Sequence, residues 1–344
     1  MTGPLDHLHS IKLKIGVVIV AAVVVTAFLV VVAARTRLPL WLCGIGAVAI
    51  ALVMVQLLAR GLTAPLRAMA EATADMAAGR YERRVYTASM DEVGELAVAF
   101  NRMAEQLAEV DTERRELIAN VSHELRTPIG AMQAVMENIV DGVEQSDPAT
   151  MQTMLAQVQR LGRLVTQLLD LSRLDARDAR LTVEPFAVAP LLEAAVREAQ
   201  IGVGRADMPL VRLELSVQPP ALEATGDPER IRQVMANLLD NAISHSPEGG
   251  RVAVGARRQD GAGSGPPRIE LEVSDEGPGI APDDAARVFD RFYRGTANGS
   301  GAARDGGTGL GLAIAKQIVD LHGGSIEALD GGESGCRMVV GLPG

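Results

Sequence analysis

One histidine of the chain is a candidate for chemistry, because it lies in segment 122–128, which reads S-H-E-L-R-T-P. Apolar residues recur at heptad spacing on both sides of His123, which predicts a helix. Glu124 follows it directly, and the pair Thr127-Pro128 comes one turn later. This combination indicates a histidine displayed on a helix bundle for chemistry. Taken alone, the segment could also carry an ordinary surface histidine.

Two asparagines further along could hold a metal ion against phosphates. Residues 226–229 (G-D-P-E) cap and open a predicted helix that runs to about His245. Asn237 and Asn241 are four residues apart and therefore share one face of it. Amide oxygens are hard ligands that suit Mg²⁺. The alternative is a pair of solvated amides. The other face should turn to a core, through Ile231, Val234, Leu238 and Ala242.

An aspartate at the end of a predicted strand could recognise adenine. Residues 269–274 alternate apolar and polar, as a half-buried strand does, and Asp275 follows. Its carboxylate can accept a hydrogen bond from an exocyclic amine. Gly277 and Gly279 allow a sharp turn and a close approach of the base. The alternative is a simple turn after a strand.

A glycine-rich segment then suggests a phosphate site that is not a P-loop. Residues 289–294 (F-D-R-F-Y-R) lead into 295–307, a run rich in Gly, Ala and Ser that we expect to form a mobile lid. Gly307, Thr308, Gly309, Leu310 and Gly311 open a helix whose free N–H groups suit phosphate. The three lysines, at 12, 14 and 316, are not in a P-loop context, and the glycines do not match a dinucleotide motif.

The elements around His123 predict a dimeric bundle. The heptad seam runs from Val93 to Ile139, so one helix could extend through His123. Asp141-Gly142 interrupts it, and Asp147-Pro148 can start a second helix with an apolar face. Two such helices are too thin to fold alone. We therefore expect a homodimer with a four-helix bundle.

The N-terminal region predicts two membrane helices, at 15–34 and 38–59, joined by a short external loop at 35–37. Twenty apolar residues span ~30 Å, which matches a bilayer core. A cleaved signal peptide is the alternative for the first run, but its apolar core is too long. The basic residues Lys12, Lys14, Arg60 and Arg67 outside the hairpin, against Arg35 and Arg37 within the loop, favour termini in the cytosol.

The linker after the second span has its own pattern. Pro65 precedes a short amphipathic helix that Gly79 ends, and a polar connector, 80–90, leads to 91–95 (D-E-V-G-E) and a second helix. This arrangement resembles a HAMP linker, a dimeric coiled coil that joins membrane helices to signalling domains. An ordinary helical hairpin is the alternative.

Composition excludes several classes of protein. The formal net charge of −10 argues against a nucleic-acid-binding surface. Cys43 and Cys336 are isolated, so they predict neither a disulfide framework nor a metal site.

In this order, the motifs resemble those of a bacterial transmembrane sensor histidine kinase. L-I-A-N-V-S-H-E-L-R-T-P is similar to its H box and N-L-L-D-N-A to its N box. D-E-G-P-G-I, F-D-R-F-Y-R and G-T-G-L-G-L-A-I are similar to its G1, F and G2 boxes. Related ATP-binding folds in gyrase and heat-shock chaperones share the asparagine and D-x-G-x-G features but lack the histidine box.

The resemblance implies a role for each matching residue. His123 would accept the phosphoryl group, Glu124 would hydrogen-bond its imidazole and accept a proton, and Thr127 would orient a water for dephosphorylation of the partner. Asn241 would bind Mg²⁺ with Asn237 nearby, Asp275 would contact adenine, and Arg294 and Arg304 would meet phosphates. Two departures are Ser244, where relatives carry Lys or Arg, and Leu117, where Phe is usual.

The resemblance therefore implies a multidomain α and α/β protein at the bacterial plasma membrane, with its kinase domains in the cytosol. The expected parts are a cytoplasmic tail (1–14), the membrane hairpin, a HAMP-like linker (60–112), a dimerisation and phospho-acceptor domain (113–178) and an α/β sandwich of the Bergerat type (179–344) that binds ATP and Mg²⁺. Phosphoryl transfer would go to an aspartate of a response regulator, in answer to a signal sensed in or near the membrane lipid. The alternative is a regulator that mainly dephosphorylates or scaffolds its partner.

Overall fold

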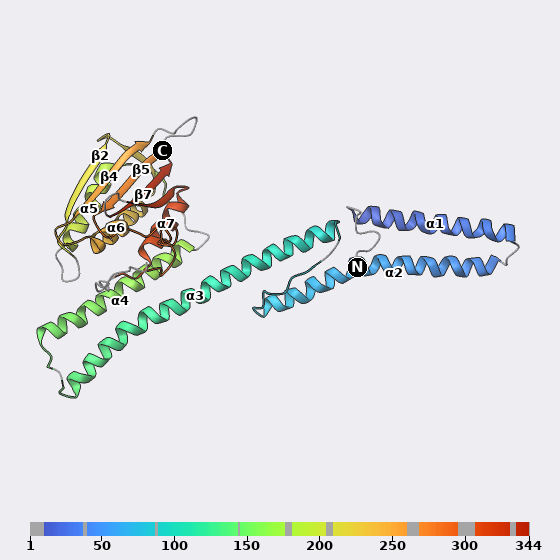
Figure 1. Ribbon diagram of the computed structural model, residues 1–344, viewed down its shortest axis with the longest axis horizontal. Coiled ribbons are helices and arrows are strands. Elements are labelled where there is room, and N and C mark those ends of the chain that lie inside the picture. The colour runs from blue at the N-terminus through green and yellow to red at the C-terminus, as the bar shows by residue number, and fades with distance from the viewer. Residues whose placement is uncertain are drawn as a thin grey trace. The chain divides into compact units, whose positions relative to one another are not determined.

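A computed structural model describes residues 10–36, 40–86, 89–143, 145–175, 181–203, 209–259, 268–294, 307–330 and 335–343. The chain divides into two compact units, Met1–Ile118 and Ala119–Gly344. Figure 1 shows the elements of both, and each unit is described by itself.

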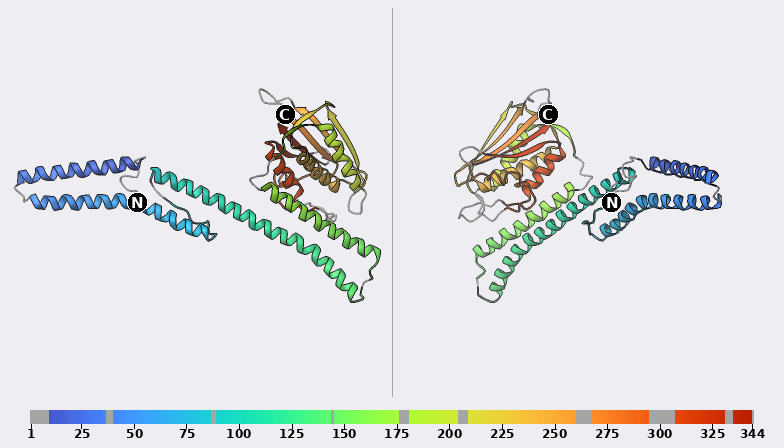
Figure 2. Two further views of the ribbon diagram at one scale, coloured as in Figure 1. Left: turned by 180° about the vertical axis from the view of Figure 1, so that it is seen from behind. Right: turned by 45° about the vertical axis from the view of Figure 1, so that its right-hand side comes forward.

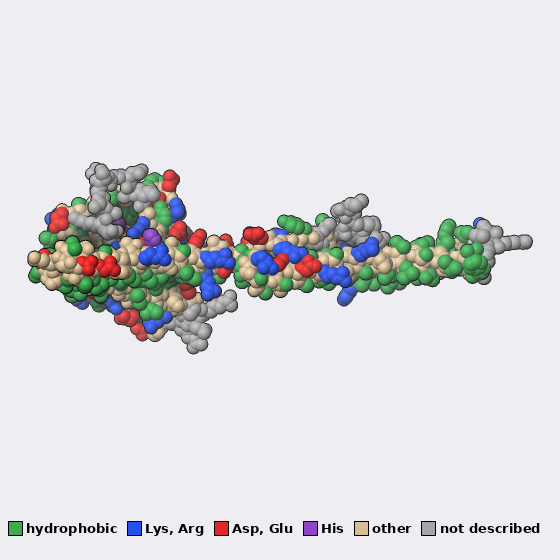
Figure 3. Space-filling view, turned by 90° about the horizontal axis from the view of Figure 1, so that it is seen from below, with side chains coloured by type: hydrophobic (Ala, Val, Ile, Leu, Met, Phe, Trp, Pro, Cys, Tyr) green, Lys and Arg blue, Asp and Glu red, His purple; other side chains and the backbone are tan. Residues whose placement is uncertain are grey.

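The first unit begins with two apolar helices, α1 (Ile11–Thr36) and α2 (Leu40–Ala77). Stretches Ile11–Val32 and Gly44–Ala77 are long and apolar enough to cross a membrane. Their large apolar side chains are mostly exposed, and Figure 3 shows green apolar side chains over this part of the surface. The predicted loop at 35–37 needs correction, because Arg35 and Thr36 still belong to α1, while Arg37 lies outside the described residues.

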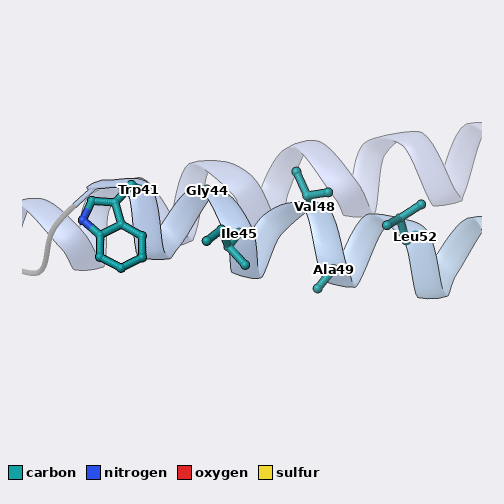
Figure 4. Close-up of a pocket in the computed structure, with 6 residues that line it drawn as sticks. All are labelled: Trp41, Gly44, Ile45, Val48, Ala49 and Leu52. Carbon is teal, nitrogen blue, oxygen red and sulfur yellow. The ribbon is translucent and has the colours of Figure 1, made fainter.

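An open apolar groove follows one face of α2. Figure 4 shows its lining, which comprises Trp41, Gly44, Ile45, Val48, Ala49 and Leu52. The small residues Gly44 and Ala49 leave the hollow between larger side chains. It lies within the predicted second span, so its apolar character suits a lipid-facing or helix-packing surface.

The linker differs from the prediction in one respect. α2 continues through Pro65 without a break, whereas the sequence pattern predicted a separate short helix after the membrane span. Proline removes only one backbone hydrogen bond, and neighbouring turns carry the helix past it. Gly79, with φ of +77°, follows the end of α2 as predicted. A small core of Met69, Ala72, Val85, Val93, Ala97 and Phe100 then joins α2 to the next helix.

A long helical hairpin carries the phospho-acceptor segment. α3 (Glu92–Val140) is one helix from the linker through His123, which confirms the predicted continuous helix. Gly142, with φ of +74°, follows its end. α4 (Pro148–Asp175) begins where predicted, since the Asp147 carboxylate accepts a hydrogen bond from the Thr150 N–H at 2.7 Å.

The C-terminal part is an α/β sandwich. A five-stranded sheet has the order β2 (Arg212–Gln218), β4 (Arg251–Gln259), β5 (Arg268–Asp275), β7 (Cys336–Pro343) and β6 (Ser325–Asp330). Strands β2 and β4 are parallel, and the other neighbours are antiparallel. A small antiparallel pair, β1 (Glu184–Ala187) with β3 (Glu223–Gly226), lies beside it. The alternating pattern at 269–274 had predicted β5.

Three helices cover one face of this sheet, as Figure 2 shows from two sides. They are α5 (Val188–Gly202), α6 (Pro228–His245) and α7 (Gly311–Leu321). The predicted core face of α6 is confirmed, because Ile231, Val234, Leu238 and Ala242 are all buried. Asp227 caps this helix by accepting from the Arg230 N–H. Packing of α6 between α5 and α7 thus fixes which way its two asparagines face.

Candidate functional site

The candidate acceptor is an exposed histidine on α3. His123 and Thr127 are exposed, and Pro128 is buried in the same helix. The Thr127 hydroxyl donates to the His123 carbonyl oxygen at 3.3 Å, so both side chains leave the helix on one face, one turn apart. An imidazole in this position is accessible to a phosphoryl donor and to a partner protein.

The carboxylate of Glu124 has cationic partners. Its Oε2 pairs with Arg294 at 2.8 Å and with Arg160 on α4 at 3.6 Å. The predicted hydrogen bond from Glu124 to its neighbouring imidazole is not among the contacts of the described residues. Since a half-buried carboxylate is stabilised most by guanidinium groups, the arginines take precedence in this arrangement.

Asp275 lies at the end of β5 and is 6% exposed. One oxygen, Oδ1, accepts from the Gly277 N–H at 2.8 Å and the Cys336 N–H at 3.2 Å. Burial raises the pKa of Asp275 above that of an ordinary aspartate, and these two hydrogen bonds act in the opposite direction. Because both described contacts use Oδ1, the other oxygen can accept from a ligand.

The glycines after Asp275 leave space that a side chain would fill. A Cβ on Gly277 would lie 2.6 Å from the His245 carbonyl oxygen. Gly279 has φ of +75°, and a Cβ there would lie 2.9 Å from the Gly335 carbonyl oxygen. The end of β5 therefore approaches the end of α6 through a turn that only glycine fits.

The two asparagines of α6 are half-buried, and Asn237 lies close to the start of α7. A Cβ on Gly311 would lie 3.6 Å from the Asn237 Oδ1, so the two helices approach closely here. The Asn237 Nδ2 is buried and has no hydrogen-bond partner in the described part of the chain. A buried donor without a partner costs free energy, so it favours an oxygen-rich ligand at this point. Asn241, one turn later, is half-buried.

The segment Phe289–Arg294 is fastened to the start of α7. The Phe292 N–H donates to the Gly309 carbonyl oxygen at 2.8 Å. Gly309 has φ of +70°, and a Cβ there would lie 2.8 Å from the Phe292 backbone. Phe292 itself has φ of 61°, which a bulky residue adopts only under constraint. The sequence had placed both segments near phosphates, and the structure brings them together.

Polar contacts connect this region with α4. The Thr308 hydroxyl contacts the Gln167 Oε1 at 2.5 Å, and the Arg294 guanidinium also donates to the Gly307 carbonyl oxygen at 2.7 Å. Asp175, the last residue of α4, accepts from Arg291 and from Gln317 on α7, each at 2.7 Å.

Sequence reasoning missed the contributions of Arg160, Gln167 and Asp175. Each is an ordinary polar residue on an amphipathic helix. The contact of α4 with α3 brings Arg160 to the site, and the contacts of α4 with the region of α7 bring Gln167 and Asp175 there. Leu310, which belongs to the predicted phosphate segment 307–311, is fully buried and anchors this segment to the core.

The departure at Ser244 has a structural counterpart. The Ser244 hydroxyl donates to the Asp240 carbonyl oxygen at 2.7 Å, within α6. This side chain therefore brings no cation to the site. Arg304, which the resemblance places at the phosphates, lies outside the described residues.

Three family models match the chain in sequence order. They are the HAMP domain at 57–109, the His Kinase A (phospho-acceptor) domain at 113–177, and the histidine kinase-, DNA gyrase B- and HSP90-like ATPase at 226–344. These three domains, in this order, place the chain in the sensor histidine kinase family.

Curated relatives agree with this assignment. The signal transduction histidine-protein kinase BaeS of Escherichia coli is 35% identical over 306 residues, which cover 88% of this chain and 62% of BaeS. The histidine-protein kinase/phosphatase MprB of Mycolicibacterium smegmatis is 34% identical over 314 residues, or 88% of this chain and 60% of MprB. The chain thus spans about three fifths of the length of these relatives.

A solved structure shares the fold. The histidine kinase ThkA in complex with the response regulator protein TrrA superposes with a TM-score of 0.53 at 22% identity, over 66% of this chain and 61% of that one. At this identity the likeness concerns the fold alone.

Proposed function

We propose that this protein is an ATP-dependent histidine kinase that phosphorylates His123 and then passes the phosphoryl group to an aspartate of a response regulator. The observation that carries the proposal is the contact of Arg294 with Glu124. It connects the phosphate-side segment of the sandwich with the residue next to the exposed histidine, within one compact unit. The curated relatives BaeS and MprB, which are named as signal transduction histidine-protein kinases, support this class of reaction.

ATP would bind at the edge of the sandwich between α6 and α7. The free oxygen of Asp275 accepts from the exocyclic amine of adenine, and Gly277 leaves space for the base. The phosphates lie toward Gly307–Gly311, with Asn237 donating from its unpartnered amide. Gly279 and Gly309 hold the two turns open.

Asn241, together with the phosphates, would hold Mg²⁺, which neutralises charge as it develops in the transferring group. Within the described ranges, no cluster of three acidic, histidine or cysteine side chains occurs.

In the chemical step, an imidazole nitrogen of His123 forms a bond to the γ-phosphorus, and the bond from that phosphorus to the β–γ bridging oxygen breaks. ADP leaves with the electron pair. Glu124 accepts the proton from the other ring nitrogen once the arginines release its carboxylate. Arg294, freed in the same movement, is then available to the phosphates.

The surroundings of the site fit a membrane-anchored homodimer. α1 and α2 would cross the plasma membrane twice and contact lipid through their exposed apolar side chains, with the rest of the chain in the cytosol. Exposed apolar residues on the hairpin, among them Ile129, Met136, Leu155 and Val158, would be covered by a second copy in a four-helix bundle.

The direct test uses the full chain in lipid nanodiscs with γ-labelled ATP and Mg²⁺. We expect label that is labile to acid and stable to alkali, and its complete loss in His123→Gln. His9→Gln, a histidine in the N-terminal tail, is the matched control and should label normally. Label that persists in His123→Gln would exclude His123 as the acceptor.

A phosphatase-dominant regulator is the second candidate function, because Ser244 adds no cation at the γ-phosphate. MprB, a relative named as both kinase and phosphatase, makes removal of phosphate from the partner a plausible activity for this family member. Thr127→Ala should slow dephosphorylation of a phosphorylated response regulator at least tenfold while self-labelling persists, and Thr127→Ser should retain both. A wild-type protein that speeds dephosphorylation without labelling itself would favour this second candidate.

A further inference from the structure

The cytosolic end of the first membrane helix is fastened to the start of α3 by a buried ion pair. The Lys14 Nζ lies 2.6 Å from the Asp91 Oδ2 and 2.6 Å from the Ser89 Oγ. The side chain of Lys14 is 6% exposed and that of Asp91 is 1% exposed. A buried charge requires a partner, so each residue depends on the other.

Asp91 serves α3 at the same time. Its second oxygen, Oδ1, accepts from the Val93 N–H at 3.1 Å and the Gly94 N–H at 3.3 Å, which caps the first turn. Burial raises the pKa of Asp91, but its hydrogen bonds with Lys14, Ser89 and Gly94 lower the pKa by more. The net pKa is below that of an ordinary aspartate, so the carboxylate is ionised. A Cβ on Gly94 would lie 2.0 Å from the Ser89 carbonyl oxygen, so this turn is closely packed.

Glu92 makes the reciprocal contact with α1. Its Oε2 accepts from the Ile11 N–H at 2.7 Å and its Oε1 from the Ser10 hydroxyl at 2.9 Å. The first amide of α1 is thus satisfied by a residue from α3, and the positive end of the helix faces a carboxylate. Ile11 also packs against the small core of the linker. Lys14, Asp91 and Glu92 together form what we name the reciprocal clamp.

We propose that the reciprocal clamp couples the first membrane helix directly to the helix that carries His123, without passing through α2. α3 is continuous from Glu92 to Val140, so a shift of α1 along its axis would pull on the end of the acceptor helix. The second membrane helix reaches α3 through the linker core, by way of Met69 and Ala72, whereas the ion pair of Lys14 with Asp91 does not involve α2. Relative displacement of the two membrane helices would then set the state of α3. This inference rests on the proposed kinase function only for its activity readout.

Its test is a double-mutant cycle in the full chain, reconstituted in nanodiscs of neutral phospholipid. Lys14→Met keeps the aliphatic stem, and Asp91→Asn keeps a cap for α3. We expect each variant to change the ratio of self-labelling rate to dephosphorylation rate at least fivefold, in the same direction, and the double variant to equal the single ones because the contact is already lost.

Lys12→Met is the matched control, since Lys12 is exposed on the same turn and forms no ion pair within the described ranges. We expect its ratio to stay within twofold of the wild type. A ratio for Lys14→Met that equals that of Lys12→Met, or additive effects in the double variant, would overturn the proposal.

A second readout does not require kinase activity. Hydrogen exchange of segments 10–14 and 91–95 should become at least tenfold faster in Lys14→Met and stay unchanged in Lys12→Met, because the clamp protects the Ile11 and Gly94 amides. Unchanged exchange in Lys14→Met would overturn the clamp. If Lys14→Met loses protection from hydrogen exchange but the wild-type protein never labels itself, the kinase proposal would be wrong and the reciprocal clamp would still be supported.

Discussion

At the scale of single residues, the site depends on side chains with two competing uses. Arg294 contacts Glu124 in the structure and also donates a hydrogen bond to the Gly307 carbonyl oxygen, at the start of the predicted phosphate segment. Asp275 was predictable from sequence, since its partner Gly277 is two residues away. Arg160 was not, because its contact with Glu124 joins two different helices.

Asp275→Asn should separate ligand recognition from folding. Asparagine can still accept from the Gly277 and Cys336 amides, but its NH₂ group would then face the adenine amine, a donor against a donor. A lost charge-assisted hydrogen bond is worth about 1.5–3 kcal/mol, so we expect ATP affinity to fall about 10- to 100-fold. Isothermal titration with an ATP analogue measures it. Glu327→Gln, the same charge change on exposed β6, should bind normally.

The same residue predicts two pH effects. Burial raises the pKa of Asp275 in the folded state. Its stabilising contribution is therefore complete below the unfolded-state pKa and is lost as pH rises through the folded-state pKa. The Tm of Asp275→Asn should exceed that of the wild type at neutral pH, and the difference should shrink toward pH 4. ATP affinity of the wild type should fall as Asp275 is protonated, at higher pH than for an ordinary aspartate. A pH-independent Tm difference would contradict this account.

At the scale of elements, local signals for helix ends were reliable. The Asp147 and Asp227 caps and the glycines after α2 and α3 lie where the sequence placed them, because a cap bonds within three residues of itself. The uninterrupted passage of α2 through Pro65 was not predictable, since a proline can either end or merely weaken a helix. Some turn glycines have a positive φ and no room for a Cβ, so only glycine fits there. Others, such as Gly307, have open space around them.

Gly309→Ala and Gly307→Ala test this division. Alanine at 309 requires a positive φ and places a Cβ 2.8 Å from the Phe292 backbone, whereas nothing lies within 4 Å of a Cβ at 307. We expect Gly309→Ala to lower ATP affinity at least tenfold and to speed hydrogen exchange at 289–294, because the two segments separate. Gly307→Ala should resemble the wild type. Equal effects of the two alanines would argue against a constrained turn.

At the scale of the C-terminal unit, the helical hairpin and the sandwich hold each other through polar side chains. Glu124, Gln167 and Asp175 bind Arg294, Thr308 and Arg291 respectively. These contacts occupy Glu124 and Arg294, both of which the proposed reaction needs. On the proposed function, this arrangement would be inactive, because Glu124 and Arg294 are paired with each other. Their contact would have to break before the reaction could proceed.

Asp175→Asn should favour release. It weakens the ion pair with Arg291 and the hydrogen bond from Gln317, while the residues proposed to contact ATP, Mg²⁺ or His123 stay unchanged. A hydrogen bond of this kind contributes about 0.5–1.5 kcal/mol, so we expect self-labelling to become about two- to tenfold faster. Asp141→Asn in the turn of the same hairpin is the control, with an unchanged rate. A slower rate in Asp175→Asn would mean that the docked arrangement is the productive one.

The sequence by itself determined the order of the parts, the residue types at the site and most helix boundaries, because periodicity, caps and glycine turns act over a few residues. It also placed the core face of α6 and an aspartate at the end of β5. Only the tertiary structure decided that Glu124 faces two arginines, that Asn237 keeps an unpartnered donor and that Lys14 is buried against Asp91. These contacts join residues far apart in the chain, so they follow from how the helices pack, which no local pattern encodes.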